Sequence, residues 1–294
     1  EVVREELDDL VLAAAASGVP VTDLAFPDPL PEHALSRAWQ RLRAMQAIDA
    51  EGLLTDHGRR LFPLPLDPLL AHLITAMPDT ATTAAMADLA AALTVDRPLL
   101  PPIRSEEAGE ALREWAPEAD DAATLVRLVR SNPPKAVPIN KAAVDEARRI
   151  SNRIRSALDL PERQPAAPLP REEMLAATVA AAAELAYVRR AKRREALGNE
   201  GSEVKPAAES RFPEDAEAAV VFDQHAVPGK GTTQTLNLGT CMAPVALATL
   251  AEQGVGQVEY AEPEWDGERV TVTARRTYAG RTLIAEPTEP EGDA

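Results

Sequence analysis

The sequence is poor in the residues that build disulfides and metal sites. It has one cysteine, Cys241, and four histidines, and these five side chains lie far apart along 294 residues. One cysteine excludes an internal disulfide, and a zinc site needs about four ligands at close spacings. No run approaches the ~20 apolar residues that a membrane helix requires. We therefore expect a cytoplasmic protein with no metal and no membrane partner.

Aromatic residues are also scarce, at 3%, whereas 45% of the residues are apolar. Many of the apolar residues are alanine, which favours closely packed helices over aromatic-rich β-sandwiches. The formal charge of −16 argues against a protein that coats duplex nucleic acid, because lysine and arginine supply most of the non-specific affinity for phosphates. Any contact with nucleic acid must therefore be local.

Motifs for catalysis and nucleotide binding are missing as well. No G-x-x-x-x-G-K-[ST] loop occurs, and the nearest fragment, Gly229–Thr233, is interpreted as a hairpin turn. Gly254 and Gly256 lack the third glycine of a dinucleotide site. No G-x-S-x-G elbow is present. Carboxylate pairs are expected on solvated helix faces, namely Asp8/Asp9, Glu106/Glu107 and Asp120/Asp121. The chain alone is predicted to be neither an enzyme nor a cofactor-binding protein.

Residues 1–66 have the layout of a winged helix. Apolar spacing predicts a helix over residues 4–16 that stops at Gly18, and a second helix after Pro31. Two short apolar pieces around a turn at 47–55 predict a small hairpin. Thr55 is placed to cap a short third helix that ends near Arg60. The polar face of the second helix carries Arg37, Arg41 and Arg43.

Residues 67–187 are predicted to form a helical bundle with a proline-rich connection at 161–170, after which Pro170 starts a helix at Arg171. Past Arg194 the pattern becomes strand-like, and about five short runs with one inserted helix suit a small OB-type barrel at 188–294. These runs lie at 219–222, 233–238, 255–259, 269–274 and 281–284. An open α+β sheet is the alternative. The fold class is mainly α with a C-terminal β part.

Two basic clusters are candidate nucleic-acid contacts. One is the run at the junction between helix and strand: Arg189, Arg190, Lys192, Arg193 and Arg194. It could bind phosphate locally, or it could be a solvated helix end whose cations complement the helix dipole.

The second cluster lies on the helix predicted near Val144–Leu158. Its apolar arc leaves four arginines on the remaining surface, namely Arg148, Arg149, Arg153 and Arg155. This face could track a nucleic-acid backbone, or it could be explained by ion pairs within the helix. In the run 269–275, alternation places Arg275 on a polar strand face that is either a binding platform or solvated.

Several segments, in this order, resemble the region that follows the motor domains of DEAH-box helicases. They are Leu7–Gly18, Phe26–Pro29, Leu42–Asp49, Leu54–Arg59 and Leu64–Ala71. Toward the C-terminus, Gly198–Gly201, Glu264–Gly267, Ala274–Arg276 and Gly280 resemble the bacterial HrpB-type helicases. The chain departs from that subfamily at Ala183–Arg190, where an Ala-Phe-Pro-Asp-Arg-like stretch is usual.

The resemblance implies a winged-helix domain, a helical "ratchet" bundle and an OB-like domain that close over a threaded strand. It also implies an ATP-dependent RNA helicase whose ATP- and Mg-binding motor lies upstream. The expected partners are single-stranded RNA or DNA and the chain's own RecA-like motor domains. Two alternatives remain open: a free-standing winged-helix DNA-binding regulator, and a protein-interaction scaffold.

Overall fold

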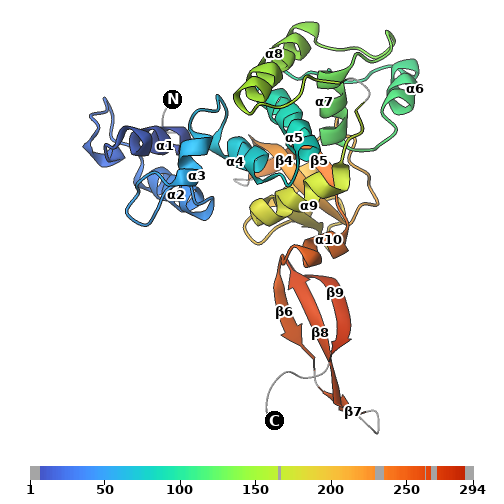
Figure 1. The fold of residues 1–294 in the computed structure, drawn as a ribbon. Coiled ribbons are helices and arrows are strands. Elements are labelled where there is room, and N and C mark those ends of the chain that lie inside the picture. The colour runs from blue at the N-terminus through green and yellow to red at the C-terminus, as the bar shows by residue number, and fades with distance from the viewer. Residues whose placement is uncertain (1–6, 165–166, 229–234, 262, 266–269, 289–294) are drawn as a thin grey trace. The chain divides into compact units, whose positions relative to one another are not determined.

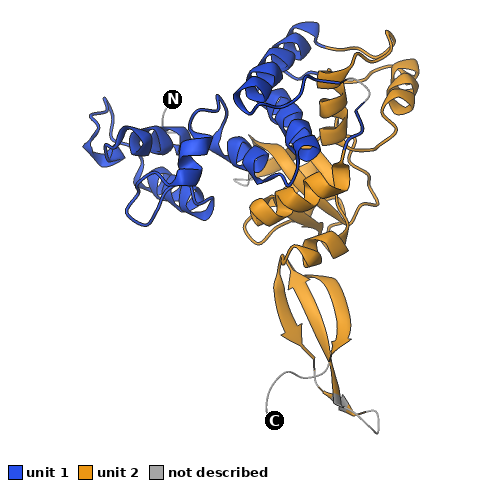
Figure 2. Cartoon of the chain, viewed as in Figure 1, with its two compact units in different colours: residues 1–99, 140–169 blue, residues 100–139, 170–294 orange. Residues whose placement is uncertain are grey.

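A computed structural model describes residues 7–164, 167–228, 235–261, 263–265 and 270–288 of the chain. These residues form two compact units. Unit 1 comprises residues 1–99 and 140–169, and unit 2 comprises residues 100–139 and 170–294 (Figure 2). The division into three domains at 66/67 and 187/188 stays a prediction. No helix in the described part of the chain is long and apolar enough to cross a membrane.

Unit 1 begins with the predicted order of helix, helix, turn and helix (Figure 1). Its elements are α1 (Asp8–Ser17), the 3-10 turn η1 (Val21–Asp23), α2 (Glu32–Ala44) and α3 (Asp56–Leu61). α1 ends at Gly18, whose φ of 70° is the left-handed conformation that glycine adopts without strain. The predicted hairpin is reduced to one antiparallel bridge, Ile48 to Leu54. The Thr55 side chain caps α3 by accepting a bond from the Gly58 amide, as predicted.

The rest of unit 1 is α4 (Pro68–Ala76), α5 (Thr80–Leu93) and α8 (Lys141–Ala157). Asp79 and Thr82 form a reciprocal capping box at the start of α5. α5 is buried from Ala84 to Ala92, and its small alanines let α4 and α8 pack closely against it. The helices of the range predicted as one bundle, residues 67–187, are divided between the two units: α4, α5 and α8 lie in unit 1, and the others lie in unit 2.

A buried ion pair joins α5 to α8. The Arg155 Nη2 of α8 lies 2.7 Å from Oδ2 of Asp88 on α5, and the side chains are 6% and 0% exposed. Arg155 also donates from Nε to Asp88 Oδ1, from Nη2 to the Ala84 carbonyl and from Nη1 to the Pro161 carbonyl. Ser151 donates to Asp88 Oδ1 at 2.6 Å. The expectation that Arg155 lies on the surface was therefore wrong, because a carboxylate on the neighbouring helix draws it inward.

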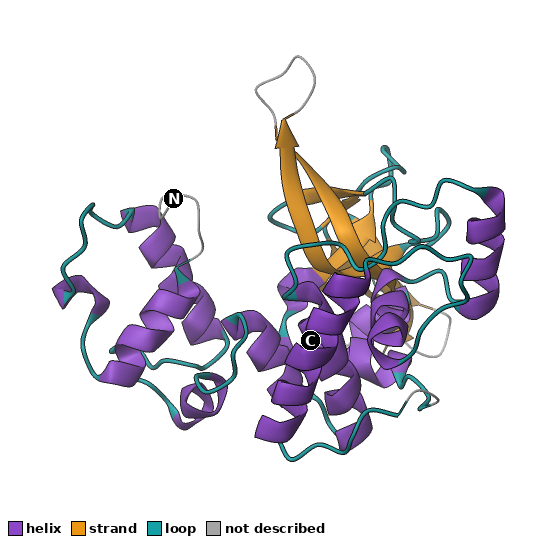
Figure 3. Cartoon of the chain, turned by 90° about the horizontal axis from the view of Figure 1, so that it is seen from above, coloured by secondary structure: helices purple, strands orange, loops and turns teal. Residues whose placement is uncertain are grey.

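Unit 2 combines α6 (Glu106–Trp115), α7 (Asp121–Arg130), α9 (Arg171–Ala181) and the 3-10 turn η2 (Ala183–Leu185) with a closed five-stranded barrel. The barrel strands are β1 (Ala186–Arg189), β2 (Leu197–Gly198), β3 (Glu203–Pro206), β4 (Ala218–Pro228) and β5 (Thr235–Pro244). Their order is β1-β2-β3-β5-β4, with β3 and β5 parallel. In Figure 3, β4 and β5 extend beyond the shorter strands. The prediction of a closed barrel is confirmed.

The strands that build this barrel differ from the prediction. The first three are only two to four residues long, too short for alternation to reveal them, and β1 and β3 also contain charged residues. The last three predicted runs form a separate sheet after α10 (Leu247–Glu252). That sheet contains β6 (Gln257–Tyr260), β7 (Glu264–Trp265), β8 (Val270–Tyr278) and β9 (Arg281–Thr288). The Tyr278 hydroxyl donates to the Ala186 carbonyl at 3.0 Å and so ties the sheet to the barrel.

Two buried carboxylates fix the helices of unit 2. Asp121 accepts bonds from the Ser210 hydroxyl and from the amides of Arg211 and Met242, at 2.6, 2.7 and 3.1 Å. Asp120 caps α7 and lies 2.6 Å from Arg171 of α9. Burial raises the pKa of both carboxyl groups. The expectation of solvated faces was wrong for this pair, and for Asp8, which is 3% exposed and pairs with Arg41. Glu106 and Glu107 are exposed, as expected.

We expect Asp88→Ala to destabilise unit 1 by about 3–5 kcal/mol, because it leaves the buried Arg155 guanidinium without its carboxylate. Urea denaturation measures this change. Asp145→Ala is the matched control, since Asp145 lies on α8 at the partly exposed surface, and we expect it to change the free energy of unfolding by less than ~0.5 kcal/mol. Equal effects of the two variants would contradict the structural role of the ion pair.

His57 of α3 and His72 of α4 predict a pH dependence. His57 Nε2 lies 2.9 Å from His72 Nδ1, an arrangement in which one ring must stay neutral to accept. Burial, His72 and Arg60 lower the pKa of His57. The folded state therefore binds fewer protons than the unfolded state, and stability falls as the pH drops through about 6.5. We expect His57→Gln to lose less stability than the wild type between pH 7.5 and 5.5 in urea titrations; parallel losses would contradict this assignment.

Candidate nucleic-acid interface

The predicted basic face of α8 is present in unit 1, with one change. Arg149, Asn152 and Arg153 are exposed, and Arg148 is half-buried. Arg155 is 5% exposed and uses its guanidinium on Asp88 and two carbonyl groups inside the protein. Glu146 pairs with Arg97, which follows α5, at 3.4 Å rather than with a neighbour on its own helix. The exposed arginines of α8 can therefore meet a ligand.

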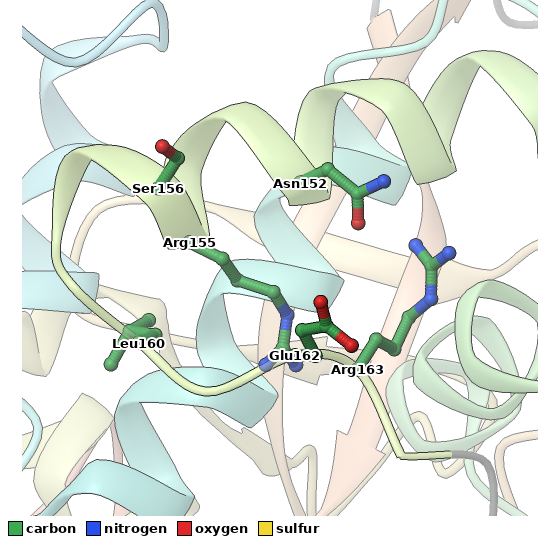
Figure 4. A pocket seen from close by; sticks show the side chains of 6 residues that line it. All are labelled: Asn152, Arg155, Ser156, Leu160, Glu162 and Arg163. Atoms are coloured by element: carbon green, nitrogen blue, oxygen red, sulfur yellow. The ribbon is translucent and has the colours of Figure 1, made fainter.

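A pocket of about 550 Å³ lies at the C-terminal end of this face. Asn152, Arg155 and Ser156 of α8 and Leu160, Glu162 and Arg163 of the following segment line it. In Figure 4 the Arg163 side chain extends toward Asn152, and Glu162 lies between Arg163 and Arg155. The predicted site set did not include Arg163, because residues 161–170 were interpreted as a connection. The sequence feature that could have pointed to Arg163 is its position two residues after Pro161.

The Arg163 guanidinium lies among charges of both signs. Its Nη1 donates to the Arg148 carbonyl at 3.2 Å. Burial lowers the pKa of Arg163; of the nearby charges, Asp88 has the largest effect and raises it, whereas Arg148 and Arg155 lower it. Asp88 also pairs with Arg155, so its single negative charge is shared between two guanidinium groups. The site is thus suited to an anion.

The other predicted cluster, the run at residues 189–194, is largely neutralised inside unit 2. Arg189 ends β1, is 2% exposed and donates to the carbonyls of Ala216, Arg194 and Pro213. Arg190 and Arg193 both pair with Glu203, at 3.5 and 3.0 Å, and Arg194 pairs with Glu217 at 2.6 Å. Lys192 is exposed. The alternative of a helix end was wrong, because α9 ends at Ala181 and a strand precedes the run.

Arg275 lies on β8, where it is exposed and directly opposite Glu259 of β6. The same sheet carries Tyr260 and Trp265, which are 65% and 66% exposed. Arg269, the other arginine of this polar face, lies outside the described residues. A carboxylate neighbour makes Arg275 a weaker candidate for phosphate than the arginines of α8.

Neither a metal nor a reactive thiol emerges from the described residues. Among them, no group of three or more His, Cys, Asp or Glu side chains could hold a metal ion. Cys241 is buried, and burial raises the pKa of its thiol well above the usual value, so it stays protonated at neutral pH. The Gly229–Thr233 turn lies outside the described residues. The exposed arginines of α8 can bind anions.

Comparison with known proteins relates this fold to DExH-box helicases. The fold matches the C-terminal domains of that class, with the helical part followed by a five-stranded barrel and a small sheet. The structure of the E. coli DExH-box NTPase HrpB matches 99% of this chain and 31% of its own, with a TM-score of 0.66 and 16% identity.

Sequence similarity extends to a eukaryotic helicase. The Schizosaccharomyces pombe pre-mRNA-splicing factor ATP-dependent RNA helicase prp22 is 28% identical over 130 residues, which are 44% of this chain and 11% of that protein. The chain thus spans a minor part of both relatives. No family model matches the chain.

The two clusters predict different effects of mutation. We expect the double variant Arg149→Gln/Arg153→Gln to bind a single-stranded oligonucleotide roughly tenfold more weakly at low salt, because it removes exposed phosphate contacts. Arg190→Gln/Arg193→Gln removes the same charge, yet we expect about a twofold change or less, because Glu203 pairs with both arginines and Glu195 also pairs with Arg193. Fluorescence anisotropy gives both dissociation constants. A larger loss of affinity in Arg190→Gln/Arg193→Gln than in Arg149→Gln/Arg153→Gln would contradict the choice of α8 over the 189–194 run.

Proposed function

We propose that this chain is the accessory C-terminal region of an ATP-dependent DEAH-box RNA helicase that works in the cytoplasm. It contacts single-stranded nucleic acid and couples that contact to RecA-like motor domains elsewhere in the same polypeptide. ATP and Mg bind in the motor. The observation that carries the proposal is the match of 99% of the chain to HrpB. The partial sequence similarity to prp22, whose name describes an ATP-dependent RNA helicase, supports it.

The chemistry of unit 1 supports contact with a phosphate backbone rather than with bases. Arg149, Asn152 and Arg153 lie within five residues on the exposed part of α8, which suits a strand that runs along the helix. Base stacking needs aromatic platforms, and the chain has few aromatics. Since the whole chain carries a charge of −16, the affinity must come from this local face together with the motor.

The two alternative functions have weaker support. A free-standing winged-helix regulator needs a basic second helix, yet Arg41 of α2 pairs with Asp8, and Arg43 donates to the Asp49 carbonyl and lies over the Trp39 ring. A protein-interaction scaffold would use exposed apolar side chains, and Tyr260 and Trp265 in the C-terminal sheet are the specific observation in its favour.

The test compares nucleoside triphosphate hydrolysis by this chain alone and by the longer polypeptide that also carries the motor domains. We expect no hydrolysis by the chain alone, and hydrolysis by the longer polypeptide that single-stranded RNA stimulates. We expect Arg149→Gln/Arg153→Gln in the longer polypeptide to weaken the stimulation by RNA while leaving the RNA-independent rate unchanged. Hydrolysis by the chain alone, or stimulation that is insensitive to this variant, would contradict the proposal.

A further inference from the structure

The pocket at the end of α8 is held in shape by the buried ion pair. Arg155 donates from Nη1 to the Pro161 carbonyl at 2.8 Å, and the Leu160 amide donates to the Arg155 carbonyl at 2.9 Å. These bonds fix the chain on the N-terminal side of Arg163. The Arg163 Nη1 bond to the Arg148 carbonyl then holds the guanidinium itself. A side chain that is fixed before binding loses less conformational entropy when it meets a ligand.

Arg155 and Arg163 have different roles in this pocket. Arg155 donates to Asp88, Ala84 and Pro161 and its charge is paired with Asp88, so it shapes the pocket rather than binding the ligand. Toward the described residues, Arg163 makes one hydrogen bond, from Nη1. Its Nε and Nη2 remain as donors, and the exposed Asn152 amide lies toward it in Figure 4. An arginine fork and an amide donor together match the oxygens of a phosphate group.

We propose that this pocket is a phosphate site in which Arg163 and Asn152 bind one phosphate of the single strand that follows α8. The assignment rests on the proposed function and adds a defined position to it. Arg148 adds positive charge nearby, while Glu162 at the rim opposes the anion and limits its affinity. The strand thus meets a fixed contact where α8 ends, after the exposed arginines of its surface.

The experiment uses the longer polypeptide with its motor domains and measures the affinity for a labelled single-stranded oligonucleotide between 50 and 200 mM salt. Affinity falls as salt rises, and loss of one phosphate contact reduces the magnitude of the slope of log affinity against log salt by about 0.7 for a single strand. We expect this decrease in Arg163→Gln, and a slope close to the wild type in Arg163→Lys, which retains the charge. Arg104→Gln, an exposed arginine of unit 2, is the control and should leave the slope unchanged. Glu162→Gln should increase the affinity several-fold.

The outcomes separate the two proposals. If the wild type binds the oligonucleotide but Arg163→Gln keeps its slope, the phosphate site is overturned and the proposed function stands. If the wild type binds no oligonucleotide, the proposed function fails, and the phosphate site on the strand fails with it. Thermal stabilisation by inorganic phosphate alone, present in the wild type and lost in Arg163→Gln together with an unchanged slope, would identify a free phosphate as the ligand and overturn the backbone assignment.

Discussion

The position of α8 depends on the ion pair between Asp88 and Arg155, which lies in the interior of unit 1. A buried guanidinium without its carboxylate is costly, so this pair permits few other orientations of the helix. The same arginine holds the Pro161 carbonyl and therefore sets the course of the chain after α8. With this face turned inward, Arg149 and Arg153 are exposed on the opposite side. The buried Asp88–Arg155 pair thus determines which arginines of α8 are exposed to a ligand.

Unit 2 is also held together by a buried carboxylate, that of Asp121. Asp121 joins α7 to the barrel through the amide of Met242 in β5 and to the loop before β4 through Ser210 and the Arg211 amide. Arg190, Arg193 and Arg194 of this unit are paired with Glu203 and Glu217. In a chain with an excess of acid, basic residues are readily neutralised by their neighbours. The exposed arginines of α8 differ in this respect from those of the 189–194 run.

The fold was largely predictable wherever local chemistry decides it. The cap at Thr55, the stop at Gly18 and the start of α9 at Arg171 follow from the conformational limits of one or two residues. The barrel strands and the role of Arg155 were not predictable, because both depend on partners distant in sequence. β3 pairs with β5 some thirty residues away, and Asp88 lies 67 residues before Arg155. Arg163 was missed because residues 161–170 were interpreted as a connection, so its proximity to Arg148 was not considered.

The claim that α8 carries the nucleic-acid contact can be tested directly by photo-crosslinking. The longer polypeptide with its motor would be bound to a single strand containing 4-thiouridine, irradiated and digested, and its cross-linked peptides identified by mass spectrometry. We predict cross-links in the segment from Arg148 to Arg163. Cross-links confined to residues 189–194 or to the C-terminal sheet, with none in this segment, would contradict the account.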